Sequence, residues 1–258
     1  MTTPPVRYLI VNADDFGLSQ GVNRGIIRAH DHGIVTSASL MVSQPGAADA
    51  AKYGRSRPGL SVGLHLDLGE WACRDGQWRA VYEFAPAADA AAVQAEVSRQ
   101  MDLFFELMGR PPTHVDSHQH AHRSEPLASI ARELAGRVGV PLRHFTPGIH
   151  YCGDFYGQTG KSEPLPGAIT PEALARVIKS LGPGVTELSC HPGDDPLLPC
   201  MYRDERLAEV ATLCQPTLNE LLSEHAFQLV SFSTVPIELF RGDGLVEKAA
   251  DGSRTRNN

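Results

Sequence analysis

Short apolar segments rich in β-branched residues alternate with longer segments of helical periodicity along most of the chain. The apolar segments predict strands at residues 8–11, 37–42, 60–68, 113–118, 142–145, 185–190 and 228–235. Strands that alternate with helices are typical of a parallel sheet whose faces are covered by helices. The pattern therefore predicts an α/β fold in the form of a (β/α) barrel, closed or nearly closed, of seven or eight strands.

The segments between the strands carry helix signals. Ser19 is placed to cap a first helix whose apolar face contains Val22, Ile26 and Ala29. Further helices are predicted at residues 89–108 and 124–138, from residue 170 onward, and across residues 207–222. The last of these contains Pro216, which should kink or restart the helix.

The length and the end of the chain fit this architecture. A single (β/α) barrel takes roughly 250 residues, and the chain has 258. We therefore expect residues 1–240 to form one domain. Residues 241–258 are mostly polar, and we expect them to be a disordered tail.

Charge and cysteine content narrow the class of protein. The chain has 23 Lys+Arg against 30 Asp+Glu, a net charge of −7, and a pI near 5.9, which argues against a nucleic-acid partner. No segment approaches the roughly 18 apolar residues of a membrane span, and residues 1–7 lack the features of a secretory signal. Five cysteines without CxxC spacing do not form a disulfide framework. These features predict a soluble cytoplasmic protein with no membrane partner. The oligomeric state, a homodimer included, is left open.

Polar clusters lie at the carboxyl ends of four of the predicted strands. They are Asp14-Asp15, His65, the segment 116–122 and His191. In a (β/α) barrel the carboxyl ends of the strands carry the chemistry, so these side chains should meet at one rim.

The segment 116–122 reads Asp-Ser-His-Gln-His-Ala-His. While the strand lasts, alternation would place Asp116, His118, His120 and His122 on one face. Taken singly, each cluster has an ordinary explanation, since adjacent aspartates can cap a turn and a lone histidine is more often a core residue than a ligand. Together, an aspartate and two histidines at one rim form a divalent metal site with positions left open for water.

Five motifs, in order and spacing, resemble those of the YdjC-like carbohydrate deacetylases, a family that includes chitooligosaccharide deacetylases and proteins associated with hopanoid biosynthesis. They lie at residues 9–18, 33–40, 63–66, 109–122 and 190–192. The resemblance implies a distorted (β/α) barrel of about seven parallel strands, related to the barrels of polysaccharide deacetylases. It also implies one divalent metal ion, Mg²⁺ or Zn²⁺, with Mn²⁺ and Co²⁺ as further candidates.

The resemblance also implies roles for particular residues. The metal ligands would be Asp15, His65 and His118. Asp14 would be the general base and His191 the general acid on the opposite side. Arg143 matches an arginine near the base, where it could hold Asp14 ionised.

This arrangement suits the hydrolysis of an amide. A bound metal ion makes water nucleophilic and polarises the carbonyl. A second carboxylate, Asp14, can take the proton of the water, and a histidine from another strand, His191, can protonate the leaving amine.

Aromatic residues gather in two segments that should lie near the rim. Residues 70–84 include Trp71 and Trp78, and residues 146–165 include Tyr151. Aromatic faces can stack on sugar rings, so we expect these three residues to contact the substrate. A lid packed onto the barrel, or a dimer contact, would explain the same pattern.

The sequence thus predicts a metal-dependent hydrolase that removes an acetyl group from an N-acetylated amino sugar or oligosaccharide of the chitooligosaccharide type. The alternatives are a metal amidohydrolase acting on a non-sugar amide or a hopanoid-pathway intermediate, and a catalytically silent protein that binds metal or sugar.

Overall fold

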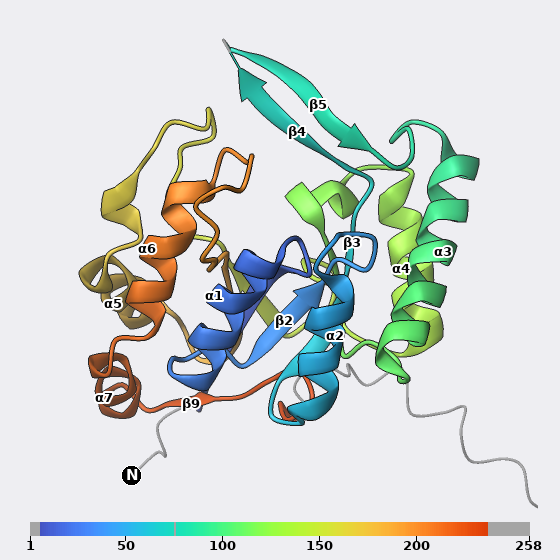
Figure 1. Ribbon diagram of the computed structural model, residues 1–258. Helices are drawn as coiled ribbons and strands as arrows, with labels where there is room; N and C mark the ends of the chain where they lie inside the picture. Colours follow the sequence, from blue (N-terminus) through green and yellow to red (C-terminus); the bar gives the residue numbers. More distant parts are fainter. Residues whose placement is uncertain (1–5, 75, 237–258) are drawn as a thin grey trace, which may run out of the picture.

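The computed structural model describes residues 6–74 and 76–236 (Figure 1). Seven parallel strands form one sheet in the order β6-β3-β2-β1-β8-β7, with β9 paired to the first residues of β1. The strands are β1 (Arg7–Phe16), β2 (Ser37–Leu40), β3 (Ser61–Leu66), β6 (Val115–Ser117), β7 (Ile149–Cys152), β8 (Gly184–Cys190) and β9 (Phe227–Leu229). This curled parallel sheet with outer helices confirms the predicted distorted barrel.

The barrel is distorted because the predicted strand at residues 142–145 does not form. Leu142 makes one parallel bridge to Val115 and then turns away. The amide of Thr146 donates to the carbonyl of Leu142, and His144 has a left-handed φ of 67°. A strand cannot continue through such a turn, so the sheet has no complete strand between β6 and β7.

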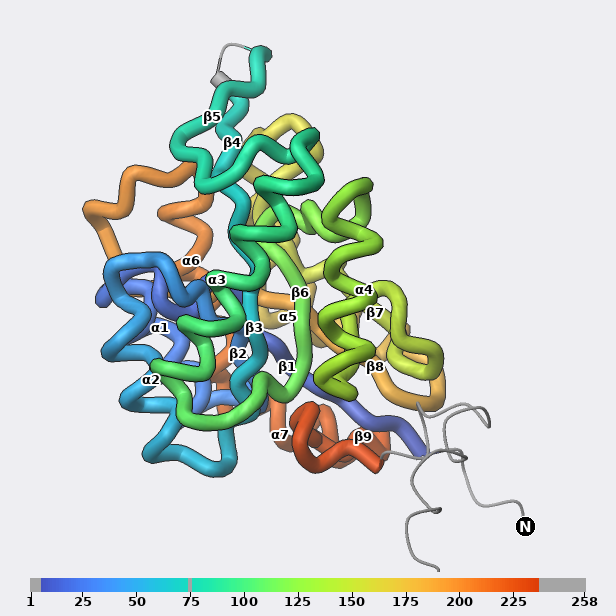
Figure 2. The backbone as a smooth tube through the Cα atoms, turned by 90° about the vertical axis from the view of Figure 1, so that its right-hand side faces the viewer, coloured from blue at the N-terminus to red at the C-terminus, as the bar shows by residue number. Residues whose placement is uncertain are grey.

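Seven α-helices pack around the outside of the described sheet (Figures 1 and 2). They are α1 (Gln20–Asp31), α2 (Ala47–Ser56), α3 (Ala90–Met108), α4 (Leu127–Val138), α5 (Pro171–Ser180), α6 (Arg203–Leu213) and α7 (Thr217–Glu224). The predicted cap at Ser19 is confirmed, since its side chain accepts the amide proton of Val22. The predicted interruption at Pro216 is also confirmed, because α7 starts there as a separate helix.

The helix α2 was not predicted. It begins after Gly46 without a side-chain cap, and its buried positions are alanines and a glycine. Neither a capping residue nor a stripe of large apolar side chains marks it in the sequence.

Alternation along β1 separates the two faces of the sheet. Leu9, Val11 and Ala13 belong to the main core, which also includes buried residues of α1. Ile10 belongs instead to a small second core with Val185. Since Asn12 and Asp14 share the parity of Ile10, the concave face of the sheet passes from apolar to polar toward the carboxyl end of β1.

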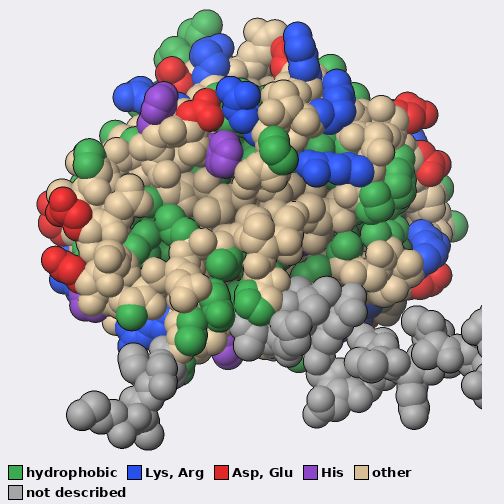
Figure 3. All heavy atoms as spheres, turned by 90° about the horizontal axis from the view of Figure 1, so that it is seen from below, with side chains coloured by type: hydrophobic (Ala, Val, Ile, Leu, Met, Phe, Trp, Pro, Cys, Tyr) green, Lys and Arg blue, Asp and Glu red, His purple; other side chains and the backbone are tan. Residues whose placement is uncertain are grey.

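The second core forms a floor at the amino end of the barrel. It is completed by two residues that follow β9, Phe232 and Val235, which are 7% and 6% exposed. Seen from below, this end of the molecule has its charged side chains mostly at the edges, with backbone and uncharged side chains between them (Figure 3). The carboxyl ends of the parallel strands lie at the opposite end of the barrel.

The aromatic segment at residues 70–84 is a hairpin rather than a loop. Its strands β4 (Gly69–Arg74) and β5 (Gln77–Glu83) form a separate antiparallel pair that projects above the barrel (Figures 1 and 2). The described chain also forms two 3₁₀ helices, η1 (His118–Arg123) and η2 (Pro166–Ala168). Among the described residues, none of the helices has both the length and the apolar character needed to span a membrane. The tail predicted at residues 241–258 lies outside the described residues.

Candidate metal centre and active site

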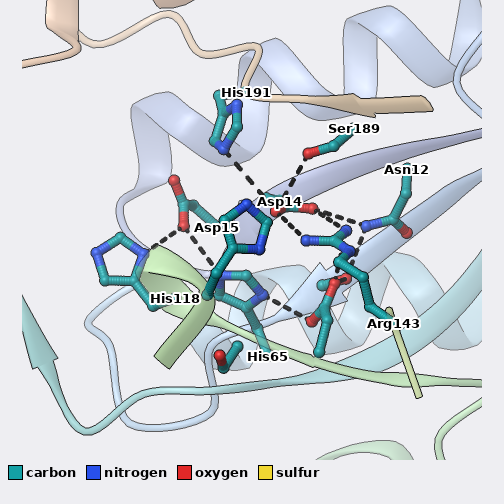
Figure 4. A network of polar contacts seen from close by, with 12 residues as sticks. Asn12, Asp14, Asp15, His65, His118, Arg143, Ser189 and His191 are labelled. Atoms are coloured by element: carbon teal, nitrogen blue, oxygen red, sulfur yellow. Dashed lines mark hydrogen bonds and ion pairs between the residues drawn. The ribbon is translucent and has the colours of Figure 1, made fainter. Parts of the chain in front are cut away.

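The polar residues at the carboxyl ends of the strands meet above the concave face (Figure 4). Asp14 and Asp15 lie near the end of β1, and His65 lies near the end of β3. His118 and His191 directly follow β6 and β8. Parallel strands bring their carboxyl ends to one edge, which is why residues so distant in sequence come together.

Neighbouring residues of a regular strand point to opposite faces, yet both aspartates reach the site. The pairing of β1 with β2 shifts its register between Ala13 and Phe16. Asp15 has a φ of 67°, in the left-handed region that non-glycine residues rarely adopt. This irregularity turns the Asp15 carboxylate toward the same cavity as that of Asp14.

Asp15, His65 and His118 form a compact cluster. Oδ1 of Asp15 lies 3.3 Å from Nε2 of His65 and 3.0 Å from Nδ1 of His118. One potential ligand atom from each residue lies within 4.8 Å of the other two. The residues that the family resemblance implied as ligands are therefore adjacent.

This cluster fits a divalent cation. The Nδ1 of His65 lies 2.7 Å from Oδ1 of Asp116, a carboxylate–histidine pair that leaves Nε2 directed at the cluster. The Nε2 of His118 is buried and lacks a hydrogen-bond partner among the described residues. Burial opposes protonation of His65, but the carboxylates of Asp116 and Asp15 raise its pKa well above the ordinary value. The surroundings therefore favour a positive charge at this position, and a bound divalent cation would replace the proton.

A second set of close residues, Asp14, His65 and Asp116, suits a cation less well. Arg143 already pairs with both carboxylates, at 2.6 Å from Asp14 and 2.8 Å from Asp116. The positive charge that a metal ion would supply is therefore present in the side chain of Arg143.

Arg143 is held among three buried carboxylates. It donates to both oxygens of Asp14 at 2.6 and 2.7 Å, and its Nη2 lies 2.6 Å from Oε1 of Glu187. Asn12 donates to Asp14 from another direction, at 2.8 Å. Burial would raise the pKa of Asp14, but Arg143 outweighs it and holds that pKa below its ordinary value. Asp14 is thus an ionised, oriented carboxylate.

His191 faces Asp14 from the other side of the cavity. Its Nε2 lies 3.8 Å from Oδ2 of Asp14, and its Nδ1 is buried without a hydrogen-bond partner among the described residues. Burial lowers the pKa of His191 to about 4, so the imidazole is neutral near pH 7. The backbone amide of His191 donates to Glu209 at 2.5 Å, and Glu209 also accepts from Tyr202.

The predicted shared face of His118, His120 and His122 is wrong. The strand β6 ends at Ser117, and η1 then turns with φ values of 50° at Gln119 and 54° at His120. Alternation therefore stops before the first of the three histidines. His118 enters the metal-type cluster, whereas His120 lines the cavity above it.

The histidines outside the cluster have structural partners. His122 is fully buried, with Nδ1 2.6 Å from Oγ of Ser117 and Nε2 3.1 Å from the carbonyl of Arg143. His114 lies deeper, with Nε2 3.0 Å from Oγ of Ser39. Burial lowers the pKa of His114 to about 4.

A cavity of about 780 Å³ opens over the cluster. Trp71 and Trp78 from the hairpin line one side of it, and Tyr151 from β7 lines another. Trp78 is 56% exposed, and the hydroxyl of Tyr151 lies 3.2 Å from Nε2 of His120. All three aromatic residues expected near the substrate thus face this cavity.

Two charged residues of the site had not been predicted. Arg206, on α6, donates to Oδ2 of Asp15 at 2.6 Å, and Glu187, on β8, holds Arg143. Glu187 could have been found, because a carboxylate inside a predicted buried strand requires a cationic partner. For Arg206 the sequence offers no such signal, since charged residues are common on an outer helix.

Comparison with known proteins gives consistent results. Residues 8–224 match the model of the family described as YdjC-like protein. The chain is 34% identical to a carbohydrate deacetylase of Geobacillus stearothermophilus, over 88% of this chain and 97% of the relative. It is 35% identical to a chitooligosaccharide deacetylase of Serratia marcescens, over 88% of this chain and 98% of the relative.

Solved structures share the fold. A protein of Enterococcus faecalis V583 that carries the description cellobiose-phosphate cleavage protein superposes with a TM-score of 0.69 at 25% identity, over 88% of this chain and 98% of that one. A family 4 carbohydrate esterase of Streptomyces lividans superposes with a TM-score of 0.51 at 16% identity, over 87% and 91% of the two chains. By its sequence match over most of its length, the chain belongs to the YdjC-like protein family.

Proposed function

We propose that the protein is a metal-dependent carbohydrate N-deacetylase that removes the acetyl group of an N-acetylated amino sugar. The observation that carries the proposal is the cluster of Asp15, His65 and His118, whose ligand atoms lie within 4.8 Å of one another beside Asp14 and His191. Hydrolysis of a sugar amide agrees with the two relatives described as carbohydrate and chitooligosaccharide deacetylases.

Asp15, His65 and His118 would hold the metal ion. When bound there, a divalent ion supplies a positive charge that acidifies water and polarises the amide carbonyl. The donor set, one carboxylate and two imidazoles, suits Zn²⁺, Mg²⁺, Mn²⁺ or Co²⁺. Arg206 keeps Oδ2 of Asp15 occupied, which leaves Oδ1 as its ligand atom.

Asp14 acts as the general base. Its two hydrogen bonds from Arg143 keep it ionised and fix the plane of its carboxylate. Oδ2 of Asp14 also lies 3.8 Å from Nε2 of His191, so the two groups flank the space where the amide would be attacked. Because the imidazole of His191 is neutral, it would act as a relay: Nε2 receives from Oδ2 of Asp14 the proton that Asp14 took from the water, and passes it to the leaving nitrogen as the carbon–nitrogen bond breaks.

The aromatic residues of the cavity bind the sugar. Trp71 and Trp78 approach from the hairpin and Tyr151 from the sheet, so a sugar ring can stack between or against them. A neighbouring polar side chain of the cavity, that of Gln158, can bond a hydroxyl group of the sugar.

The test is acetate release from N,N′-diacetylchitobiose by the purified protein, dialysed and then reloaded with Zn²⁺, Mg²⁺, Mn²⁺ or Co²⁺ in turn. We expect acetate with at least one ion and none after chelation. Simple amides such as acetanilide serve as the comparison for a non-sugar amidase. A protein that holds one ion per chain yet releases no acetate from any N-acetylated sugar would refute the proposal.

A further inference from the structure

The side chain of Gln119 forms a two-point contact with the backbone of the hairpin. Its Nε2 donates to the carbonyl of Trp71 at 2.8 Å, and the amide of Trp71 donates back to Oε1 at 3.1 Å. The primary amide thus pairs with a peptide group as a neighbouring β-strand would. Gln119 is exposed and lines the cavity, so this contact lies on the route of a ligand.

The turn that presents Gln119 is strained. Gln119 and His120 are consecutive non-glycine residues with φ values of 50° and 54°. Such a pair persists only where surrounding contacts hold it, and strain of this kind concentrates at functional sites. His118, immediately before the turn, is the residue whose Nδ1 lies 3.0 Å from Asp15.

Apart from the Gln119 contact, the hairpin is attached to the rest of the described protein mainly through β4, where Ala72 is 3% exposed, and through a few hydrogen bonds, one of them from the amide of Gly69 to Asp67 at 2.9 Å. Every residue of β5 except Tyr82 is exposed. Tyr82 donates to Asp67 at 2.9 Å, and the amide of Cys73 donates to the sulfur of Met201 at 3.2 Å. The Gln119 contact joins the hairpin to the segment that carries His118. It does so at Trp71, whose ring lines the cavity.

We propose that Gln119 is a positioning residue for the sugar: it fixes the hairpin that carries Trp71 and Trp78 to the turn that carries His118. The distance between the two tryptophans and the candidate metal ligand His118 is then fixed. This inference rests on the proposed function, because it assigns the hairpin to substrate binding. It predicts that loss of the contact weakens sugar binding and leaves metal binding intact.

The variant of choice is Gln119→Asn. Asparagine tolerates the left-handed backbone and keeps the amide, but it is one methylene too short to reach Trp71. Gln119→Glu is the second variant, since it keeps the length and replaces the donor with a charge that faces the Trp71 carbonyl. Gln94→Asn, on the exposed face of α3, is the matched control.

Fluorescence reads the hairpin directly, because both tryptophans of the chain, Trp71 and Trp78, lie on it. In a Trp78→Phe background, Trp71 is the only tryptophan. We expect Gln119→Asn to shift its emission to longer wavelength and to make it more accessible to acrylamide, with no such change in Gln94→Asn.

In the otherwise unchanged protein, we expect Gln119→Asn and Gln119→Glu to raise KM for N,N′-diacetylchitobiose about tenfold, with kcat within about twofold of the parent. The bound metal per chain should not change. Unaltered emission and KM in both variants would overturn the inference. So would a loss of metal and of kcat at constant KM, since Gln119 would then act on His118. If the parent releases no acetate, the proposed function fails, while the Trp71 emission still decides whether the contact exists.

Discussion

Asp14 and Asp15 are neighbours in the sequence, and each pairs with a buried arginine, but the two pairs differ. Arg143 donates to both oxygens of Asp14, at 2.6 and 2.7 Å. Of the two oxygens of Asp15, only Oδ2 accepts from Arg206, at 2.6 Å, and Oδ1 faces two histidines. One carboxylate is thus fully oriented by its arginine, and the other keeps an oxygen for a cation.

The difference shows how one fold assigns two roles to adjacent identical residues. Burial alone would raise the pKa of both carboxyl groups, and in each case the arginine is the first group that lowers it. Both are therefore ionised, and the number of oxygens engaged by arginine separates a base from a metal ligand. Five variants can break or sharpen this comparison.

The largest effect is expected for Asp15→Asn. The change removes the charge shared by His65, His118 and Arg206, so the protein should no longer retain a divalent ion after dialysis. Acetate release should fall by about a thousandfold. Elemental analysis and an acetate assay measure the two outcomes, and one retained ion per chain would contradict the assignment of Asp15 as a ligand.

A smaller loss is expected for Asp14→Asn. The ligand cluster is untouched, so the metal content should equal that of the parent. Turnover should fall about 10²–10³-fold, since proton transfer loses its base. Full turnover in a metal-loaded Asp14→Asn protein would show that another group takes the proton.

The two arginines give a matched pair of moderate effects. Arg206→Lys should weaken metal binding about 10–100-fold, because the partner that orients a ligand is lost. Arg143→Lys should leave metal affinity near the parent value and lower turnover instead. Calorimetric titration with Zn²⁺, alongside the acetate assay, distinguishes them. Equal metal affinities in the two variants would mean that the difference between the pairs has no consequence for binding.

The effect that is smallest near neutral pH is expected beneath Asp14, at His114→Gln. The folded-state pKa of His114 is about 4, below the ordinary value of 6.5. Between these two pH values the imidazole is protonated in the unfolded chain and neutral in the folded protein. Stability should therefore fall as the pH drops from about 6.5 toward 4, by up to about 3 kcal/mol from this residue. Urea denaturation at pH 7, 6 and 5 should give a shallower pH dependence in the variant. Identical slopes would remove His114 as a source of acid sensitivity.

Much of the fold followed from the sequence because strand–helix alternation is a local pattern. The convergence of Asp14, His65 and His191 was also predictable, since carboxyl ends of parallel strands share an edge. The path of the chain after Ser117 was not predictable. Whether Gln119 and His120 adopt left-handed backbone depends on contacts with the hairpin and with Tyr151, which lie elsewhere in the sequence.

The ion pairs were beyond sequence reasoning for the same reason. Arg206 is 191 residues from Asp15, and only the packing of α6 beside α1 brings them together. Arg143 was placed near Asp14 by resemblance, but its additional pairing with Glu187 required the structure.

A small apolar cluster covers the amino end of the barrel. It consists of Ile10, Val185, Phe232 and Val235. The cavity that reaches Asp14 is lined by the hairpin tryptophans and by none of these four apolar residues. A chain truncated before Phe232 would lose the aromatic ring that covers His114. The centroids of the two stacked rings lie 3.9 Å apart. The turn that follows β9 therefore covers the amino end of the concave face, the same face on which β1 carries Asp14.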